Sequence, residues 1–406
     1  MSGDSYTEIS SQSGDSYTEI SSQGWSSRLG NALLALPFGL ILFLASFVVL
    51  FWNEGRTVRT AKALAEGNAA VISIPSDRVD AANEGKLVHI SGEATTDQML
   101  EDPRFHLSAR AIRLRRLVKM YQWREQSQTQ TRKKLGGGEE RITTYTYSKD
   151  WSDRPIDSGQ FKKPDGHHNP RAFPFEEWSA DAGTVKLGAF RLPARLVSRI
   201  DRAEPLPVGD AERDALPADL KDRLKVDNGR YYLGEDPAHP KVGDVTVEFQ
   251  QVRPTTVSLL AQQAGDSFQP FQTRAGDAID RLQVGTATAD AMFQAAVAEN
   301  HLLAWGLRLV GFFLMATGIG LVLGPLAVFA DVIPWLGSIV RGGTWLIASG
   351  VALVLSLVTI ALGWIAYRPV IGIAVFAAAG AAFVGFTYLV RGRRRAPNRE
   401  MMPGTP

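Results

Sequence analysis

Cysteine is absent from all 406 residues of the sequence. This absence excludes disulfide bonds, thiolate zinc sites and cysteine nucleophiles together. It permits an oxidising compartment without requiring one. The formal net charge is only +2, and acidic and basic side chains nearly balance between residues 53 and 307. The sequence therefore lacks the basic surface that DNA or RNA binding needs, and we expect no nucleic-acid partner.

Ionisable side chains are also missing from four long apolar windows, at residues 29–53, 309–330, 342–367 and 369–390. A helix needs roughly 20 apolar residues to cross about 30 Å of hydrocarbon, and each window is long enough. We therefore predict four transmembrane helices, one N-terminal and three C-terminal, with the second helix beginning at residue 302. The lack of ionisable groups inside the windows argues against an ion-coupled pump and leaves a passive pore open.

The charges that flank the windows predict the topology. The last window is followed by Arg391, Arg393, Arg394, Arg395 and Arg399. Basic residues next to a span favour the cytoplasm. Four crossings then put both tails, residues 1–28 and 391–406, on the cytoplasmic side and residues 54–301 outside it. The acidic leader of the first window and its "FWNEGR" end favour an anchor over a cleaved signal peptide.

The N-terminal tail contains an 11-residue segment, SGDSYTEISSQ, repeated without change at Ser2–Gln12 and Ser13–Gln23. A segment rich in Ser, Thr and Gly with few apolar residues cannot bury enough surface to fold by itself. We expect residues 1–28 to be disordered. A recent duplication without function is preferred here to a docking motif.

The region between the first two windows has the pattern of a mainly β domain. Apolar and basic residues alternate from Ile112 to Met120, which is typical of a half-buried strand. Tyr121 and Trp123 can face aromatic residues across a turn at Gly136–Gly138, so we predict a polar hairpin. Further strands are expected at residues 184–192, 230–233, 244–252, 256–262 and 268–273, and helices at 193–201, 211–225 and 287–303. The fold class is an α+β membrane protein, with a barrel or sandwich as the β domain.

Small residues in the windows suggest where helices pack. Gly320 and Gly324 form a GxxxG pair, which suits close packing within the bundle or between protomers.

The only adjacent histidines, His167 and His168, lie in "DGHHNP". Two histidines with nearby carboxylates can hold a metal ion. However, neighbouring side chains in a strand point to opposite faces, and Asp-Gly and Asn-Pro form turns, so a structural turn is preferred. The sequence has no nucleophile elbow, phosphate loop or kinase motif. We therefore expect no cofactor and no enzymatic activity.

Several short stretches, taken in their order, are similar to one known family. They include "NEGR" (Asn53, Glu54, Gly55, Arg56), "NEGKLVHISG" (with Asn83, Glu84, Gly85), "MYQW" (with Tyr121, Trp123), "GHHNP" (Gly166, His167, His168, Asn169, Pro170), "WGLR" at Trp305–Arg308 and "GWIAYRP" (ending Tyr367, Arg368, Pro369). Each stretch is weak alone, but the ordered set runs from about Gly24 to Val390. On these residues the chain resembles the LUMA, or transmembrane protein 43, family.

The resemblance implies four spans with a large luminal domain between the first and second. Animal members of that family reside in the endoplasmic reticulum and inner nuclear membrane, self-associate, and help to organise the nuclear envelope with lamins and emerin. It offers no catalytic residues. The excess of 32 arginines over 12 lysines favours a GC-rich bacterial genome, in which lamin and emerin cannot be partners. A bacterial member would lie in the inner membrane with a periplasmic domain.

From these observations we expect a multipass membrane scaffold that organises the bilayer and binds copies of itself or other membrane and envelope proteins. The alternative is an envelope enzyme acting on lipid or glycan through carboxylates or residues 165–170. A passive pore is the third reading.

Overall fold

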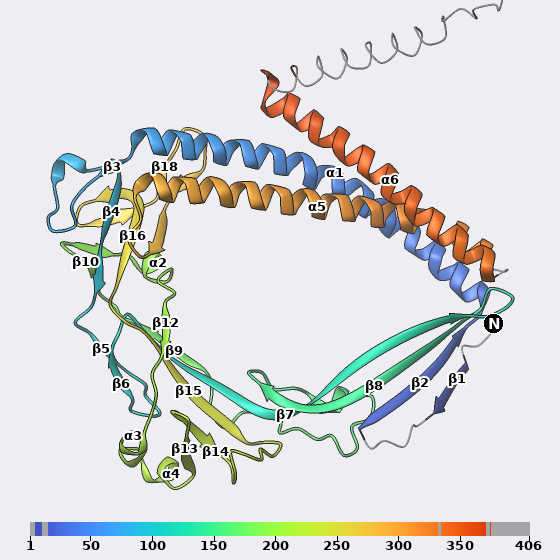
Figure 1. Ribbon diagram of the computed structural model, residues 1–406, viewed down its shortest axis with the longest axis horizontal. Coiled ribbons are helices and arrows are strands. Elements are labelled where there is room, and N and C mark those ends of the chain that lie inside the picture. Colours follow the sequence, from blue (N-terminus) through green and yellow to red (C-terminus); the bar gives the residue numbers. More distant parts are fainter. Residues whose placement is uncertain (1–4, 10–14, 332–333, 371–373, 375–406) are drawn as a thin grey trace, which may run out of the picture. The chain divides into compact units, whose positions relative to one another are not determined.

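The computed structural model describes residues 5–9, 15–331, 334–370 and 374 (Figure 1). Contacts group the chain into two units. The β unit comprises Met1–Asn31, Ala61–Glu299 and Val328–Ser338, and the helical unit comprises Ala32–Thr60, Asn300–Ala327 and Ile339–Pro406. The chain is therefore α+β, as predicted.

Three long helices provide the membrane-spanning segments. They are α1 (Trp25–Ala70, 46 residues), α5 (Ala289–Ala330, 42 residues) and α6 (Pro334–Tyr367, 34 residues). Each contains a stretch long and apolar enough to cross a membrane. A helix suits the bilayer because its backbone N–H and C=O groups bond to one another within the segment. The predicted fourth span, residues 369–390, and the basic tail, 391–406, lie almost wholly outside the described residues.

Close packing between α1 and α5 occurs at glycines other than the predicted pair. A Cβ atom on Gly39 would lie 2.7 Å from the Cβ of Leu321, and one on Gly318 would lie 2.6 Å from the backbone nitrogen of Phe43. A Cβ atom on Gly320 or Gly324 would meet nothing within 4 Å. Among the described residues the GxxxG face of α5 therefore does not point at α1, and its packing elsewhere in the bundle or between protomers stays a prediction.

The larger sheet of the β unit has nine strands in the path β1-β2-β8-β7-β15-β14-β13, with β12 and β9 attached to β15 and β7. Their bounds are β1 (Ser5–Ile9), β2 (Ser16–Gln23), β7 (Arg113–Lys133), β8 (Glu139–Ser152), β9 (Trp178–Asp181), β12 (Ala203–Pro205), β13 (Leu224–Asp227), β14 (Arg230–Leu233) and β15 (Val245–Val252). The predicted alternation is confirmed, since Leu114, Val118 and Met120 of β7 are fully buried.

Arg116 is also buried on this strand, where it forms an ion pair with Asp102 (2.7 Å). Desolvation lowers the pKa of Arg116, although the Asp102 carboxylate opposes this.

The second sheet has seven strands, with the path β11-β10-β4-β16-β17 and with β3 and β20 attached. Their bounds are β3 (Ile72–Ser73), β4 (Leu87–Thr95), β10 (Val185–Leu187), β11 (Phe190–Leu192), β16 (Thr255–Ala264), β17 (Ser267–Gln269) and β20 (Arg281–Val284). Gly85, with φ of 74°, turns the chain into β4 because a residue without Cβ adopts this conformation at little cost. The Asn83–Gly85 stretch is held to β16, since the Gly85 N–H donates to the carbonyl of Gln263 (3.0 Å).

Smaller elements complete the β unit. Two-stranded ribbons pair β5 (Met99–Glu101) with β6 (Ser108–Arg110) and β18 (Phe271–Gln272) with β19 (Ala278–Ile279). The short helices are α2 (Ala194–Val197), α3 (Asp210–Asp214) and α4 (Ala218–Lys221). The predicted helix at 211–225 is therefore broken: Pro217 separates α3 from α4, and residues 224 and 225 already belong to β13.

The predicted polar hairpin is β7–β8 (Figure 1). Tyr121 lies opposite Trp151, and their ring centroids are 5.3 Å apart. Gly136 and Gly137 in the turn have positive φ angles of 86° and 80°. The hairpin continues beyond the part of β7 that pairs with β15, and there β2 pairs with the outer side of β8.

The N-terminal tail was predicted to be disordered, and this is wrong for residues 16–23. They form β2, which pairs along its whole length with β8 from Ser16↔Thr146 to Gln23↔Glu139. Next to it, Arg28 in the first turn of α1 forms ion pairs with Asp331 (2.6 Å) and Glu139 (3.3 Å). The disorder argument failed because it weighed only the tail's own composition, whereas β8 supplies the backbone partners.

The predicted topology places the tail across the bilayer from residues 54–301, whereas β2 of the tail pairs with β8 of that region in one sheet. Polar strands with open edges are not tolerated in hydrocarbon, so this pairing and the predicted topology exclude each other.

A disulfide tests this pairing in native membranes, because the chain has no cysteine of its own. Ser22 faces Glu140 across β2 and β8, within the Cα separation that a disulfide accepts. The double variant S22C/E140C is expected to form an intrachain disulfide on mild oxidation, detected as a mobility shift. S22C/T146C, displaced by about 20 Å along the strand, should not. If S22C/E140C stays reduced, β2 does not pair with β8 in the membrane.

Candidate functional site

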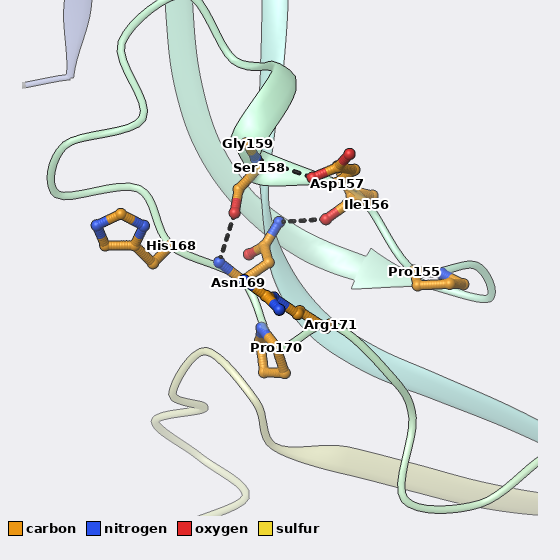
Figure 2. Close-up of a pocket in the computed structure, with 9 residues that line it drawn as sticks. All are labelled: Pro155, Ile156, Asp157, Ser158, Gly159, His168, Asn169, Pro170 and Arg171. Atoms are coloured by element: carbon orange, nitrogen blue, oxygen red, sulfur yellow. Dashed lines mark hydrogen bonds between the residues drawn. The ribbon is translucent and has the colours of Figure 1, made fainter.

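The loop that follows β8 is held to β7 through Asn169, which also bonds Ser158 and Ile156 of the same loop (Figure 2). The N–H of Trp123 donates to Asn169 Oδ1 (2.7 Å), and Asn169 Nδ2 donates to the carbonyls of Trp123 (2.9 Å) and Ile156 (3.2 Å). The Asn169 N–H donates to Ser158 Oγ (2.9 Å). The side-chain amide thus replaces a neighbouring strand for Trp123, which brings the "MYQW" and "GHHNP" stretches together.

His167 is buried in this loop, with 3% of its surface exposed. Its ring stacks on Tyr147, with 4.0 Å between centroids, and meets the Trp123 ring edge-on at 4.7 Å. Nδ1 lies 3.0 Å from the carbonyl of Lys163. Gly166, with φ of 83°, turns the chain so that His167 points inward. His167 therefore acts as a packing residue of the loop.

The two histidines do not come together as metal ligands. His168 is exposed at the edge of the loop, whereas His167 is enclosed by aromatic rings. Across the described ranges, no group of three His, Asp or Glu side chains is placed to hold a metal ion. Of the predicted pair, His167 is bonded to the backbone, and His168 lines a pocket instead.

That pocket has a volume of about 620 Å³ and lies between two parts of the loop (Figure 2). It is lined by Pro155, Ile156, Asp157, Ser158, Gly159, His168, Asn169, Pro170 and Arg171. Asp157 accepts from the Gly159 N–H (3.0 Å), so this carboxylate caps a turn. Ser158 Oγ accepts the Asn169 N–H. The polar groups at its centre therefore hold the loop in shape.

Tyr147 connects the loop to β7. Its hydroxyl donates to Glu125 Oε2 (2.8 Å) and accepts the N–H of Lys163 (2.9 Å). Burial, together with the bond to Glu125, raises the pKa of Tyr147 to about 12. The phenol therefore stays protonated through the physiological range and keeps donating to Glu125.

Replacement of Asn169 tests how firmly the loop is held. Asn169→Ala removes three side-chain hydrogen bonds and leaves the Trp123 N–H without its acceptor, which should lower the free energy of unfolding by about 1–3 kcal/mol. His168→Ala, at the exposed edge of the same pocket, should change it by ~0.5 kcal/mol or less. Chemical denaturation in detergent, followed by tryptophan fluorescence, measures both. Equal effects of the two variants would contradict the role given to Asn169.

The "NEGR" stretch lies in the helical unit and forms a second polar cluster. Glu54 of α1 is 2% exposed. Arg308 of α5 donates to both of its oxygens, with Nε 2.7 Å from Oε1 and Nη2 2.9 Å from Oε2. Trp364 of α6 donates through Nε1 to Oε2 (2.9 Å). We call this arrangement of Glu54, Arg308 and Trp364 the carboxylate clamp, because one carboxylate joins three helices.

The residues on either side of Glu54 extend the clamp. Asn53 Nδ2 donates to the carbonyl of Ala304 (3.0 Å), and Arg56 Nη1 donates to Asn300 Oδ1 (3.0 Å). Gly55 is required by space, since a Cβ atom there would lie 2.7 Å from the Tyr367 ring. α6 ends at Tyr367, before Arg368 and Pro369, as expected where proline interrupts a helix. The "NEGR" stretch of α1, the "WGLR" stretch of α5 and the "GWIAYRP" stretch at the end of α6 therefore meet in one cluster.

Sequence reasoning missed Arg308 and Trp364 as site residues. The available signal was that Glu54 directly follows one charge-free window and Arg308 directly precedes another. Opposite charges at the ends of neighbouring spans are candidates for a pair, because an unpaired charge at that depth is costly.

Removing the carboxylate should destabilise the helical unit. Glu54→Ala leaves the half-buried Arg308 guanidinium without its carboxylate partner, and removing one partner of a largely buried pair costs about 3–5 kcal/mol. Glu299→Ala breaks the exposed pair with Arg281 (2.8 Å) and should cost ~1 kcal/mol or less. Thermal unfolding of the two detergent-solubilised variants compares them. A loss for Glu54→Ala no larger than that for Glu299→Ala would refute the clamp.

Comparison with known proteins gives a consistent set of relatives. A family model described as Transmembrane protein 43 matches residues 120–369. Transmembrane protein 43 of Rattus norvegicus is 34% identical over 357 residues, covering 85% of this chain and 88% of the relative. That of Pongo abelii is 33% identical over 391 residues (93% and 94%), and the Drosophila melanogaster homolog is 29% identical over 361 residues (86% and 93%). No solved structure matches the chain.

Proposed function

Because the chain belongs to the transmembrane protein 43 family, we propose that it is a membrane scaffold rather than an enzyme. Its relatives and its apolar helices identify it as an integral membrane protein. The β unit binds copies of the chain or other membrane and envelope proteins, and the helices hold it in the bilayer.

The carboxylate clamp is the observation that carries this proposal. All three polar contacts to Glu54 come from neighbouring helices. A bidentate arginine and an indole N–H hold a carboxylate in one orientation between the helices that supply them. The charge of Glu54 therefore serves to assemble the helices.

The β unit gives a second line of support. His167 and Tyr147, whose chemistry an enzyme would use, contact each other and the loop backbone. Around them the β7–β8 hairpin presents a long ladder of polar side chains, from Gln126 to Arg132. A rigid surface of this kind suits binding another chain, which requires a fixed shape rather than a reactive group.

Crosslinking in native membranes tests the scaffold. An amine-reactive crosslinker applied to tagged chains at native abundance, followed by affinity isolation and mass spectrometry, is expected to capture a second copy or a defined set of membrane proteins. Glu54→Ala, which loosens the helical unit, should reduce that capture, and Glu299→Ala should not. Recovery of monomers alone from the unaltered chain would contradict the proposal.

A further inference from the structure

The strand β2 is recognised by side chains as well as by its backbone. Tyr17 is buried to 9% exposure, and its ring centroid lies 6.1 Å from that of Tyr145. Glu19 forms an ion pair with Lys162 (2.8 Å) and accepts from the Tyr145 hydroxyl (3.5 Å). Thr18 and Thr144 hydroxyls lie 3.3 Å apart. The β8 edge with Lys162 therefore selects a strand that carries Tyr, Thr and Glu in succession.

The chain contains this strand twice. Ser2–Gln12 repeats Ser13–Gln23 without a change, so the first repeat has the same Tyr, Thr and Glu, each 11 positions earlier. In the structure the second repeat forms β2, which pairs with the edge of β8, and the first repeat forms β1, which pairs antiparallel with the outer side of β2. One β8 edge thus has two equal ligands in every chain.

We propose that the β8 edge, with Tyr145 and Lys162, is a strand-binding site that also takes the SGDSYTEISSQ repeat of a second copy of this chain. This deepens the scaffold function and rests on it. The identity of the repeats supports this occupant, because the first repeat, which pairs with β2 and not with β8, carries every side chain that the site contacts. Strands that add to an exposed sheet edge bind through the backbone, and their side chains give specificity.

The geometry of exchange follows from the same register. A repeat from a second chain aligns its Tyr6 with Tyr145 and its Glu8 with Lys162, as Tyr17 and Glu19 do within one chain. Exchange of an identical element between copies needs no new surface. Two chains can therefore be joined by strands that each of them already possesses.

A capture experiment with three full-length forms tests this. The intact chain has both repeats. The one-repeat chain lacks residues 2–12 and keeps the repeat that pairs with β8, and the repeat-less chain lacks residues 2–23, so that its β8 edge is unoccupied. The repeat-less chain should be captured at least tenfold better by the tagged intact chain than by the tagged one-repeat chain, a difference of about 1.4 kcal/mol. Glu8→Lys in the intact chain, which places a cation against Lys162, should remove this advantage, and Ser11→Ala should not.

A second measurement avoids the deletions. Ser11 is the counterpart of Ser22, which faces Glu140. Mixing S11C chains with E140C chains should give an interchain disulfide under mild oxidation, and mixing S11C with T146C should not. Absence of that disulfide, or equal capture of the repeat-less chain by the intact and one-repeat forms, would overturn the proposal. If both tagged forms capture the repeat-less chain equally and in quantity, the chains associate through another surface and the scaffold function stands. The scaffold function is contradicted only if crosslinking in native membranes yields monomers alone.

Discussion

The helical unit depends on one buried carboxylate. Taking Glu54 out of water costs several kcal/mol unless its charge is matched, and Arg308 matches it with two parallel hydrogen bonds while Trp364 supplies a third. Since each donor stands on a different helix, the charge is satisfied only when α1, α5 and α6 are all present. Apolar contacts around Leu50 and Met315 and the close approach at Gly39 and Gly318 also pack these helices together. The ion pair adds a directional contact to this packing.

A comparable arrangement stabilises the β unit without any ion. There Asn169 gives Trp123 the hydrogen bonds of a missing strand, and His167 fills the space between two aromatic rings. In both units, the polar groups that stand out in the sequence are used to fix neighbouring segments. His167 and Glu54 therefore both contribute to the packing of neighbouring segments.

Local patterns in the sequence predicted much of this architecture, and contacts between distant residues account for what they missed. Charge-free windows predicted the helices, because a bilayer tolerates few ionisable groups, and alternation from Ile112 to Met120 predicted β7. The pair Glu54–Arg308 joins positions 254 residues apart, which no local pattern reports. Gly39 and Gly318 could not be preferred over Gly320 and Gly324, because the face turned toward a neighbour depends on the bundle. The tail strand was missed because its order comes from β8 and Lys162.

The continuity of α1 has a geometric consequence. Within the helical unit, one uninterrupted helix carries Phe43, which packs against an apolar cluster with Met315 and Ala316, and eleven residues later Glu54, which contacts α5 and α6. At 3.6 residues per turn, each residue rotates the helix by about 100°. Adding or losing a single residue between them would turn one side chain away from its partners while the other stayed in place. The number of residues in this segment is thus as constrained as their identity, because it sets the angle between the two contacts around the helix axis.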